Sequence, residues 1–307
     1  MRPGRLADQP IRSFTAAIAP RRGVPNIERR YWSAAREYRW MVAPPVAFLG
    51  VFFLFPLLRV IYSSVAQPSW TLGNYAKVVD ESFYLRSFWY TIEIAASVTV
   101  LCLIIAYPLS YTVASSRGRA QKLMWILVLV PLWTSVVIRS YAWLILFQRE
   151  GPVNAILLAL GWISEPIKIL QTSAAVEIGM VHIMLPFMVL PLVTAMVKVD
   201  ATLLRAARVL GAPPFKVFWR IYVRLTLPGA AAGCALVFIT SLGFFITPSL
   251  LGGARQTMAA MMIEQAVSVF LNWPLASALS TVLLAITVTL YLVCARLTAD
   301  EAGMVAK

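Results

Sequence analysis

The chain has 307 residues, of which 60% are hydrophobic and 13% charged, and its formal net charge is +14 at pH 7. These values exclude an ordinary soluble globular protein, because the apolar residues occur in long uncharged runs that favour lipid as the surrounding medium. The positive charge lies in an N-terminal tail and in two loops rather than on one folded face, which argues against nucleic-acid binding.

Residues 1–40 form a basic tail with nine arginines and three acidic residues. Residues 1–25 are expected to be disordered because Pro, Gly and Arg are scattered through them. The apolar residues from Ile27 to Tyr38 then recur on one helical face, which predicts a helix in the headgroup region of a bilayer. The basic region is too long for a secretory signal, so we expect the tail to be retained.

Six apolar stretches follow, and each is close to the twenty or so residues that a helix needs to cross the hydrocarbon core. They cover about residues 41–62, 91–114, 123–147, 174–197, 229–246 and 275–295. The pattern therefore predicts an all-α integral membrane protein with six transmembrane helices within residues 41–297.

The distribution of Lys and Arg between the loops predicts the orientation of these spans. The tail has nine, the loop after the second span three, and the loop over residues 198–228 six, whereas the alternate loops have two, two and one. Since Lys and Arg concentrate on the cytoplasmic side, both termini are expected to be cytoplasmic, including a short tail over residues 298–307.

Chemistry-bearing motifs are absent from the sequence. The three cysteines, Cys102, Cys234 and Cys294, lie in apolar stretches without CxxC spacing, so neither a zinc site nor a disulfide framework is indicated. No G-x-x-x-x-G-K-[ST] phosphate-binding loop occurs, so any ATP chemistry must lie on another chain. One histidine and scattered carboxylates do not form an acid/base pair, so we expect no enzyme activity and no cofactor.

The longest polar interruption between two apolar stretches is residues 199–229. Asp200 is a favourable helix N-cap residue, and residues 202–210 are predicted to be helical with Leu203, Ala207 and Leu210 on one face. Gly211 is expected to end this helix, because glycine adopts the left-handed C′ conformation without steric cost.

The second half of this loop is predicted to be a separate amphipathic segment. Pro213 and Pro214 redirect the chain. A basic stripe then follows at a spacing of four, made by Lys216, Arg220 and Arg224. Pro228 is expected to open the next apolar span.

This loop resembles the "EAA" cytoplasmic loop of ABC importer permeases. Ala206, Ala207 and Gly211 match the first part of that motif, and Leu227 with Pro228 matches its end, whereas Arg205 replaces the motif glutamate. In the family this short helix sits in a cleft of the ATPase subunit. The resemblance therefore implies an ATPase contact through Asp200, Leu203, Arg205, Ala206, Ala207, Leu210, Gly211 and Ala212. An ordinary amphipathic loop is the alternative.

Other stretches resemble the spermidine/putrescine branch of these permeases. They are AYPLSYTVA (106–114), PLWTSVVIRSYAWLILFQREGPVN (131–154), LPFMVLPL (185–192), ITPSLLGG (246–253) and NWPLASALS (272–280). The resemblance implies a MetI-like permease fold, with a cytoplasmic coupling helix between the fourth and fifth spans, in a bacterial inner membrane. It also implies a second related permease as heterodimer partner, two cytoplasmic ABC ATPase subunits, and an external or periplasmic substrate-binding protein.

A few residues within the spans are candidates for a translocation path. Gly243 and Pro248 bracket a predicted break at the end of the fifth span, and irregular backbone at membrane depth is tolerated where it lines a cavity. The candidates are Arg139, Tyr141, Trp143, Glu177, Phe244, Pro248 and Trp273. The alternatives are an ion pair of Arg139 with Glu177 or Glu93, a buried kinked span, aromatic residues that anchor the interface, and His182 as a packing residue.

The substrate is expected to be a small molecule, and a polyamine is the leading prediction. Polyamine permeases tend to carry acids at two positions of the fifth-span break, where this chain has Phe244 and Ser249. Another small organic solute, such as an opine or an amino-acid derivative, is the alternative. An ATP-independent secondary carrier would instead favour intramembrane acids placed for ion coupling and inverted repeats, which the sequence lacks.

Overall fold

A computed structural model describes residues 41–66 and 70–305, and within these residues the secondary structure is helical, with no strand. The N-terminal tail with its predicted interfacial helix, and residues 306 and 307, lie outside the described residues. The chain divides after Leu58 into two units, so the packing described below concerns residues 59–305.

The helices follow one another along the chain with short connections. Their bounds are η2 Gly50–Leu54, α2 Phe55–Ala66, α3 Gly73–Asp80, α4 Ser82–Ser115, α5 Gly118–Trp133, α6 Val136–Leu146, α7 Pro152–Ala159, α8 Ser173–Val197, α9 Ala201–Val209, α10 Pro214–Val217, η3 Phe218–Tyr222, α11 Val223–Leu242, α12 Ile246–Leu251, α13 Ala259–Ser268 and α14 Trp273–Val305. The last helix extends through most of the stretch that the sequence predicts as a C-terminal tail.

Five helical stretches among the described residues are long and apolar enough to cross a membrane, and α5 with α6 makes a sixth span if the pair is counted as one. The prediction of six spans is thereby confirmed. The prediction of one continuous helix over residues 123–147 is wrong, because Thr134 and Ser135 adopt extended backbone conformations and α6 bends away from α5 by 99°.

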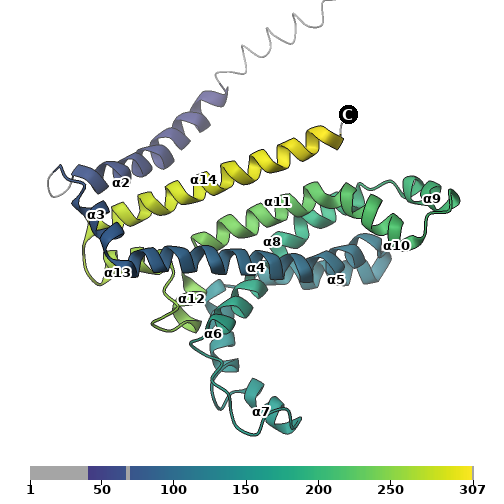
Figure 1. Cartoon of the computed structure of the whole chain (residues 1–307), viewed down its shortest axis with the longest axis horizontal. Helices are drawn as coiled ribbons and strands as arrows, with labels where there is room; N and C mark the ends of the chain where they lie inside the picture. The colour runs from purple at the N-terminus through teal and green to yellow at the C-terminus, as the bar shows by residue number, and fades with distance from the viewer. Residues whose placement is uncertain (1–40, 67–69, 306–307) are drawn as a thin grey trace, which may run out of the picture. The chain divides into compact units, whose positions relative to one another are not determined.

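The core of the second unit consists of α4, α8 and α11, which pack against one another (Figure 1). Two glycines allow α11 to approach α8 closely. A Cβ atom at Gly229 would overlap the Cβ of Ala195 and lie 2.9 Å from the carbonyl oxygen of Pro191. A Cβ at Gly233 would lie 2.7 Å from the sulfur of Met188. Small residues at such contacts are typical of helix packing in membranes.

A smaller apolar cluster joins α3, α13 and α14 to the N-terminal part of α4. Val78, Phe88, Met262 and Leu279 are buried in it. Thr91 of α4 adds a polar link, since its Oγ1 accepts a hydrogen bond of 2.8 Å from the backbone N–H of Ala259 at the start of α13. This cluster lies at the end of α4 opposite to α9 and α10 (Figure 1).

The two helix breaks lie close together in space. The first is the elbow, which we define as residues 133–139, between α5 and α6. The second separates α11, which ends at Leu242, from α12, which begins at Ile246, as the sequence predicts from Gly243 and Pro248. The hydroxyl oxygens of Ser140 on α6 and Thr247 on α12 are 2.8 Å apart, so a hydrogen bond joins the two broken segments.

Candidate functional site

The helix α9 is capped at its N-terminus as predicted. Asp200 Oδ1 accepts a hydrogen bond of 2.8 Å from the backbone N–H of Thr202. Hydrogen bonds from the side chain and backbone of Thr202, and the nearby charge of Arg205, lower the pKa of the Asp200 carboxyl below its ordinary value. The carboxylate also carries the charge that suits the positive end of a helix dipole.

The C-terminus of α9 is closed by a Schellman motif centred on Gly211. Gly211 has φ +86°, its N–H donates to the carbonyl of Arg208, and the N–H of Ala212 donates to the carbonyl of Ala207 over 3.1 Å. These two bonds satisfy carbonyls that would otherwise be unpaired at the helix end. The predicted left-handed glycine stop is confirmed.

The α9 segment presents an apolar surface to its surroundings. The exposed fractions of Leu203, Val209 and Leu210 are 52%, 87% and 86%. Arg205 and Ala206 are also exposed, whereas Leu204 packs against the core cluster and Ala207 and Ala212 are half-buried. Contiguous exposed apolar side chains mark protein–protein or membrane interaction sites.

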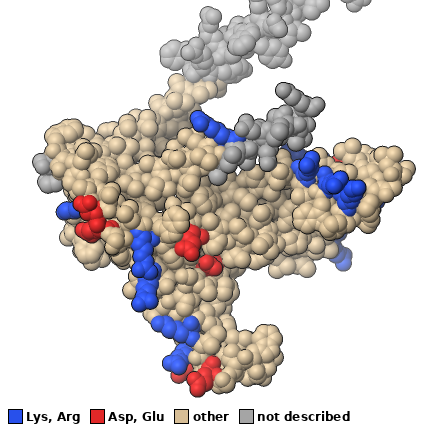
Figure 2. Space-filling view, in the orientation of Figure 1, with Lys and Arg blue, Asp and Glu red and all other residues tan. Residues whose placement is uncertain are grey.

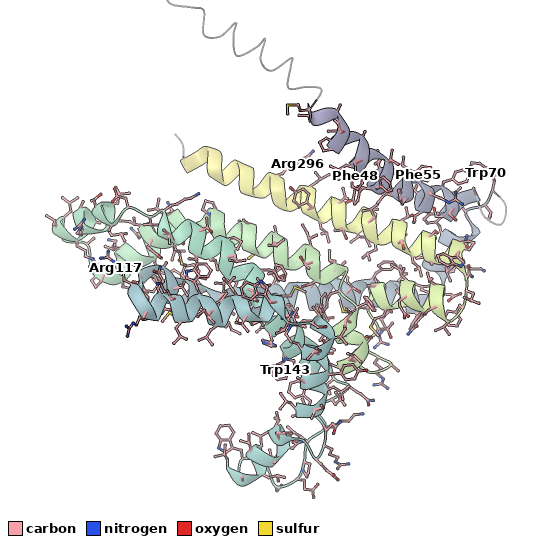
Figure 3. The ribbon with its side chains drawn as sticks, turned by 180° about the vertical axis from the view of Figure 1, so that it is seen from behind. Phe48, Phe55, Trp70, Arg117, Trp143 and Arg296 are labelled. Atoms are coloured by element: carbon pink, nitrogen blue, oxygen red, sulfur yellow. The ribbon has the colours of Figure 1, made fainter. Side chains whose placement is uncertain are left out.

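The segment after α9 differs from the prediction. The backbone stays helical from Pro214 to Leu242, and Pro228 lies inside α11 rather than at the start of a span. Pro228 is exposed, and membrane helices tolerate proline where neighbouring helices, side chains or ordered water satisfy the freed backbone carbonyl. The predicted basic residues Lys216, Arg220 and Arg224 are all exposed. Figure 2 shows basic side chains gathered near α9 and α10, and Figure 3 labels Arg117 at the same end.

A polar and aromatic contact, which sequence reasoning missed, joins this segment to α4. Residues Phe218–Tyr222 form a π-helical turn, η3. Thr226 Oγ1 lies 3.1 Å from the carbonyl oxygen of Tyr222 and 2.9 Å from the hydroxyl oxygen of Tyr107 on α4. The rings of Tyr111 and Tyr222 meet edge to face with centroids 5.4 Å apart. The sequence signal for this contact is the i→i+4 spacing of Tyr107 and Tyr111, which places both rings on one face of the helix. The hydropathy pattern that predicts the spans does not include this spacing.

Two predicted path residues, Arg139 and Trp143, lie one helical turn apart on α6 and reach toward α8. Trp143, labelled on α6 in Figure 3, donates a hydrogen bond of 3.0 Å from Nε1 to Nδ1 of His182. The charge of Arg139 is close enough to His182 to interact with the imidazole. The structure therefore brings together two path candidates and the histidine predicted to be a packing residue.

The predicted ion pair of Arg139 with Glu177 or Glu93 does not form. Nε and Nη1 of Arg139 are buried and have no hydrogen-bond partner among the described residues. Glu177 instead accepts a hydrogen bond of 3.1 Å from Ser97 Oγ on α4. The reason is geometric: Glu177 and His182 are five residues apart on α8 and so project from different sides of it, toward α4 and α6.

Glu177 belongs to a polar strip between α4 and α8. Ser97 Oγ donates a hydrogen bond to the carboxylate of Glu177. Two turns earlier on α4 and one turn earlier on α8, the hydroxyl of Tyr90 donates a hydrogen bond of 3.2 Å to Ser173 Oγ. Glu93 lies between these two contacts on α4 and is exposed. Both carboxylates are close enough to Tyr90 to act on its phenol electrostatically. The strip places two negative charges beside hydroxyl groups within two predicted spans.

The remaining path candidates differ in how far they are buried. Phe244 is half-buried against the core cluster, and Pro248 is buried in α12. Tyr141 is 51% exposed on α6, and Trp273 is 59% exposed at the start of α14. Among the described residues no group of three or more His, Cys, Asp and Glu side chains could hold a metal ion.

Comparison with known proteins gives several matches. A family model described as "Binding-protein-dependent transport system inner membrane component" matches residues 106–298. The chain is 38% identical to the spermidine/putrescine transport system permease protein PotB of Haemophilus influenzae, over 72% of this chain and 78% of that protein. It is 36% identical to PotB of Escherichia coli, over 79% of this chain and 91% of that protein.

Solved structures show the same fold at low sequence identity. A bacterial ABC transporter that imports the acidic polysaccharide alginate matches with a TM-score of 0.68 at 16% identity, covering 88% of this chain and 99% of that one. The same kind of transporter in complex with an alginate-bound periplasmic protein matches with a TM-score of 0.70. The predicted all-α, MetI-like membrane fold is confirmed.

Proposed function

The chain belongs to the family of binding-protein-dependent transport system inner membrane components, and we propose that it conducts polyamines across the membrane. It is a permease subunit of an ABC importer. The polyamine assignment is supported by the two relatives named for spermidine/putrescine transport, which are 36–38% identical over most of the chain. We place both termini, and α9 with them, on the cytoplasmic side.

The observation that carries the coupling role is the construction of α9. This helix has a side-chain cap at Asp200, a Schellman motif at Gly211, and exposed Val209 and Leu210. A short helix closed at both ends is stiff, and its exposed apolar side chains need a protein surface to cover them. We propose that this surface is a cleft in a cytoplasmic ABC ATPase, and that residues 200–212 make the contact.

In this proposal ATP binding on two partner ATPase subunits moves α9, and the spans change between inward-open and outward-open states. The motion passes to α11 through α10 and η3, because the backbone is helical throughout, and to α4 through the contact of Thr226 with Tyr107. A second related permease completes the path, and an external binding protein delivers the substrate. This chain carries no phosphate-binding loop, so its part is mechanical.

Polyamine specificity is supported by the polar strip of α4 and α8. An ammonium group that leaves water needs a carboxylate or an aromatic face to offset its lost hydration. Glu93, Glu177 and Tyr90 supply both on neighbouring helices. We propose that these groups replace the two acids that the fifth-span break lacks.

A second candidate substrate is another small organic solute, such as an opine or an amino-acid derivative. The observation that favours it is the break between α11 and α12, where Phe244 packs against the core and Ser249 bonds its own helix through the carbonyl of Ile246 at 2.8 Å. Neither side chain carries a carboxylate that would attract a cation.

The test is an ATPase assay on the complex purified with the products of neighbouring genes and reconstituted in liposomes. We expect hydrolysis to be stimulated by an external binding protein loaded with putrescine or spermidine. Stimulation only by another loaded solute would replace the polyamine by the second candidate. If no ATPase co-purifies, or if uptake proceeds on an ion gradient without ATP, the coupling role of α9 is wrong.

A further inference from the structure

The helical segment between α9 and the apolar part of α11 is longer than a membrane span requires. The backbone is helical over the 29 residues from Pro214 to Leu242, which rise about 43 Å. At an average tilt of about 20° this length spans about 41 Å, against roughly 30 Å of hydrocarbon. Residues 225–242 contain no charged side chain and rise about 27 Å, so they match the core. The excess therefore lies at residues 214–224, at the level of the lipid headgroups.

One face of residues 214–224 is packed against the bundle. Val217 and Tyr222 are buried, and the ring of Tyr222 meets that of Tyr111 on α4. The hydroxyl groups of Thr226 and Tyr107 continue this contact one turn further along. These contacts fix the orientation of the segment, so its opposite face points away from α4.

The outward face carries two parallel rows of side chains at a spacing of four residues. Phe215 and Trp219 form an aromatic row, since they are 74% and 55% exposed and their ring centroids are 6.2 Å apart. Lys216, Arg220 and Arg224 form a basic row beside it, and all three are exposed. We call these five residues the interfacial stripe. Figure 2 shows basic side chains gathered at the end of the molecule that α9 and α10 occupy in Figure 1.

The charge of the basic row is not neutralised by the chain. The sequence has no acidic residue between Asp200 and Glu264, and none between Glu93 and Glu150, which include most of α4 and all of α5. Within residues 41–66 and 70–305, the three basic side chains form no ion pair and no hydrogen bond. Their charge is therefore available to an anionic partner.

The two rows together select the chemistry of that partner. Tryptophan is enriched at membrane–water interfaces, and basic clusters beside the cytoplasmic end of a span attract anionic lipid headgroups. A free anion such as inorganic phosphate suits the basic row but leaves the aromatic rings in water. A zwitterionic lipid suits the rings but does not balance the charge. A phospholipid with an anionic headgroup satisfies both rows.

We propose that the interfacial stripe binds the headgroups of anionic phospholipids, and that this contact holds the segment between α9 and α11 at the membrane surface. The inference goes beyond the proposed function and depends on it only for the assignment of this surface to the cytoplasmic leaflet. Lipid is favoured over an acidic patch of a partner protein, because the helix continues directly into the uncharged residues 225–242 and so keeps the stripe beside the headgroups.

The test is photo-crosslinking of the assembled complex in nanodiscs of equimolar phosphatidylglycerol and phosphatidylcholine. Benzoylphenylalanine replaces Trp219 in one variant and Trp273 in the control. Trp273 is matched in exposure at 59%, begins another candidate span, and has no basic neighbour in sequence between Arg255 and Arg296. The adducts are identified by mass spectrometry, and the acyl chains of an adduct distinguish a lipid from free phosphate.

We expect phosphatidylglycerol adducts to exceed phosphatidylcholine adducts by at least about fivefold at position 219, the gain of one basic residue near an anionic surface. The two lipids should react equally at position 273. Equal reaction at position 219, equal enrichment at both positions, or adducts at position 219 with protein alone would overturn the inference. Both leaflets of a nanodisc have the same composition, so the result does not depend on orientation. Co-purification of the ATPase is scored separately and tests the proposed function.

A second measurement removes the charge and keeps the aromatic row. Arg220→Gln combined with Arg224→Gln should lower the lipid preference at position 219 to near equality, whereas Arg220→Lys combined with Arg224→Lys should retain most of it. The control is Arg149→Gln combined with Arg255→Gln, because these two arginines are also exposed but lie outside the stripe. An unchanged preference in the first double variant would contradict the binding of headgroups by the basic row.

Discussion

The indole of Trp143 and the imidazole of His182 are joined by a hydrogen bond of 3.0 Å from Nε1 to Nδ1, which connects the sideways helix α6 to the core helix α8. Since Nδ1 is the acceptor, the neutral imidazole carries its proton on Nε2. The bond is a second attachment of α6 besides the contact of Ser140 with Thr247.

Trp143→Phe should destabilise the complex by about 0.5–1.5 kcal/mol, because Nδ1 of His182 loses its donor within an apolar setting. The measurement is the thermal unfolding midpoint of the reconstituted complex. Trp162→Phe is the control, since Trp162 is 75% exposed. Equal midpoints for the two variants would show that the bond adds nothing to stability.

Gly211→Val should abolish most of the stimulation of ATP hydrolysis by loaded binding protein. A β-branched residue at φ +86° strains the backbone by about 1–2 kcal/mol or more, which opens the C-terminal motif of α9. Gly211→Asn should keep most of the stimulation, because asparagine tolerates the left-handed region. Full stimulation in the valine variant would contradict the docking role of α9.

Asp200→Ala should weaken coupling and Asp200→Asn should preserve it, since asparagine is an equally good N-cap. The lowered pKa of Asp200 means that the carboxylate cap is present above the ordinary carboxyl pKa and is lost only as pH falls through the lower value of the folded state. Stimulation in the wild type should therefore show no titration of this group around neutral pH. An Asn variant as poor as the Ala variant would count against the cap.

Glu177→Gln should raise the polyamine concentration needed for half-maximal uptake by about tenfold, if the loss of one carboxylate removes roughly 1.4 kcal/mol of cation stabilisation. Glu264→Gln is a matched control, because Glu264 on α13 also accepts a serine hydrogen bond, from Ser268 at 2.7 Å. Uptake is measured in liposomes with a fixed amount of loaded binding protein. Identical values for both variants would remove the polar strip from the path.

Gly229→Ala should reduce the yield of assembled complex, because the added methyl group overlaps the Cβ of Ala195 where α11 meets α8. Overpacking of this kind costs about 1–3 kcal/mol. Gly243→Ala is the control, since no atom lies within 4 Å of a Cβ placed there. Size-exclusion profiles of the two variants give the comparison, and equal yields would mean that α8 and α11 separate at little cost.

The features that sequence could predict are local ones. Asp200 as a cap and Gly211 as a stop follow from residue type and position alone, since capping depends on a few neighbouring backbone groups. The six spans follow from hydropathy, because lipid requires about twenty apolar residues whatever their tertiary contacts.

The features that sequence missed depend on direction in space. Hydropathy is as high after Thr134 as before it, so a bend at this residue leaves no trace in an apolar average. The predicted pair of Arg139 with Glu177 does not form, because Glu177 faces α4, and the sequence does not show which neighbouring helix a side chain of α8 faces. The sequence predicts Pro228 at the start of a span, yet it lies inside α11, because a membrane helix tolerates proline where other groups satisfy the freed carbonyl.

The π-helical turn Phe218–Tyr222 also has a consequence for how the length of the chain can vary. A π turn closes from i to i+5, so it holds one residue more than an α-helical turn. Deleting one of these five residues would restore α-helical bonding and leave α9 and the glycine face of α11 in their present orientations. The same deletion in the middle of α11 would rotate everything beyond it by about 100°. Insertions and deletions among homologous chains should therefore collect at this turn.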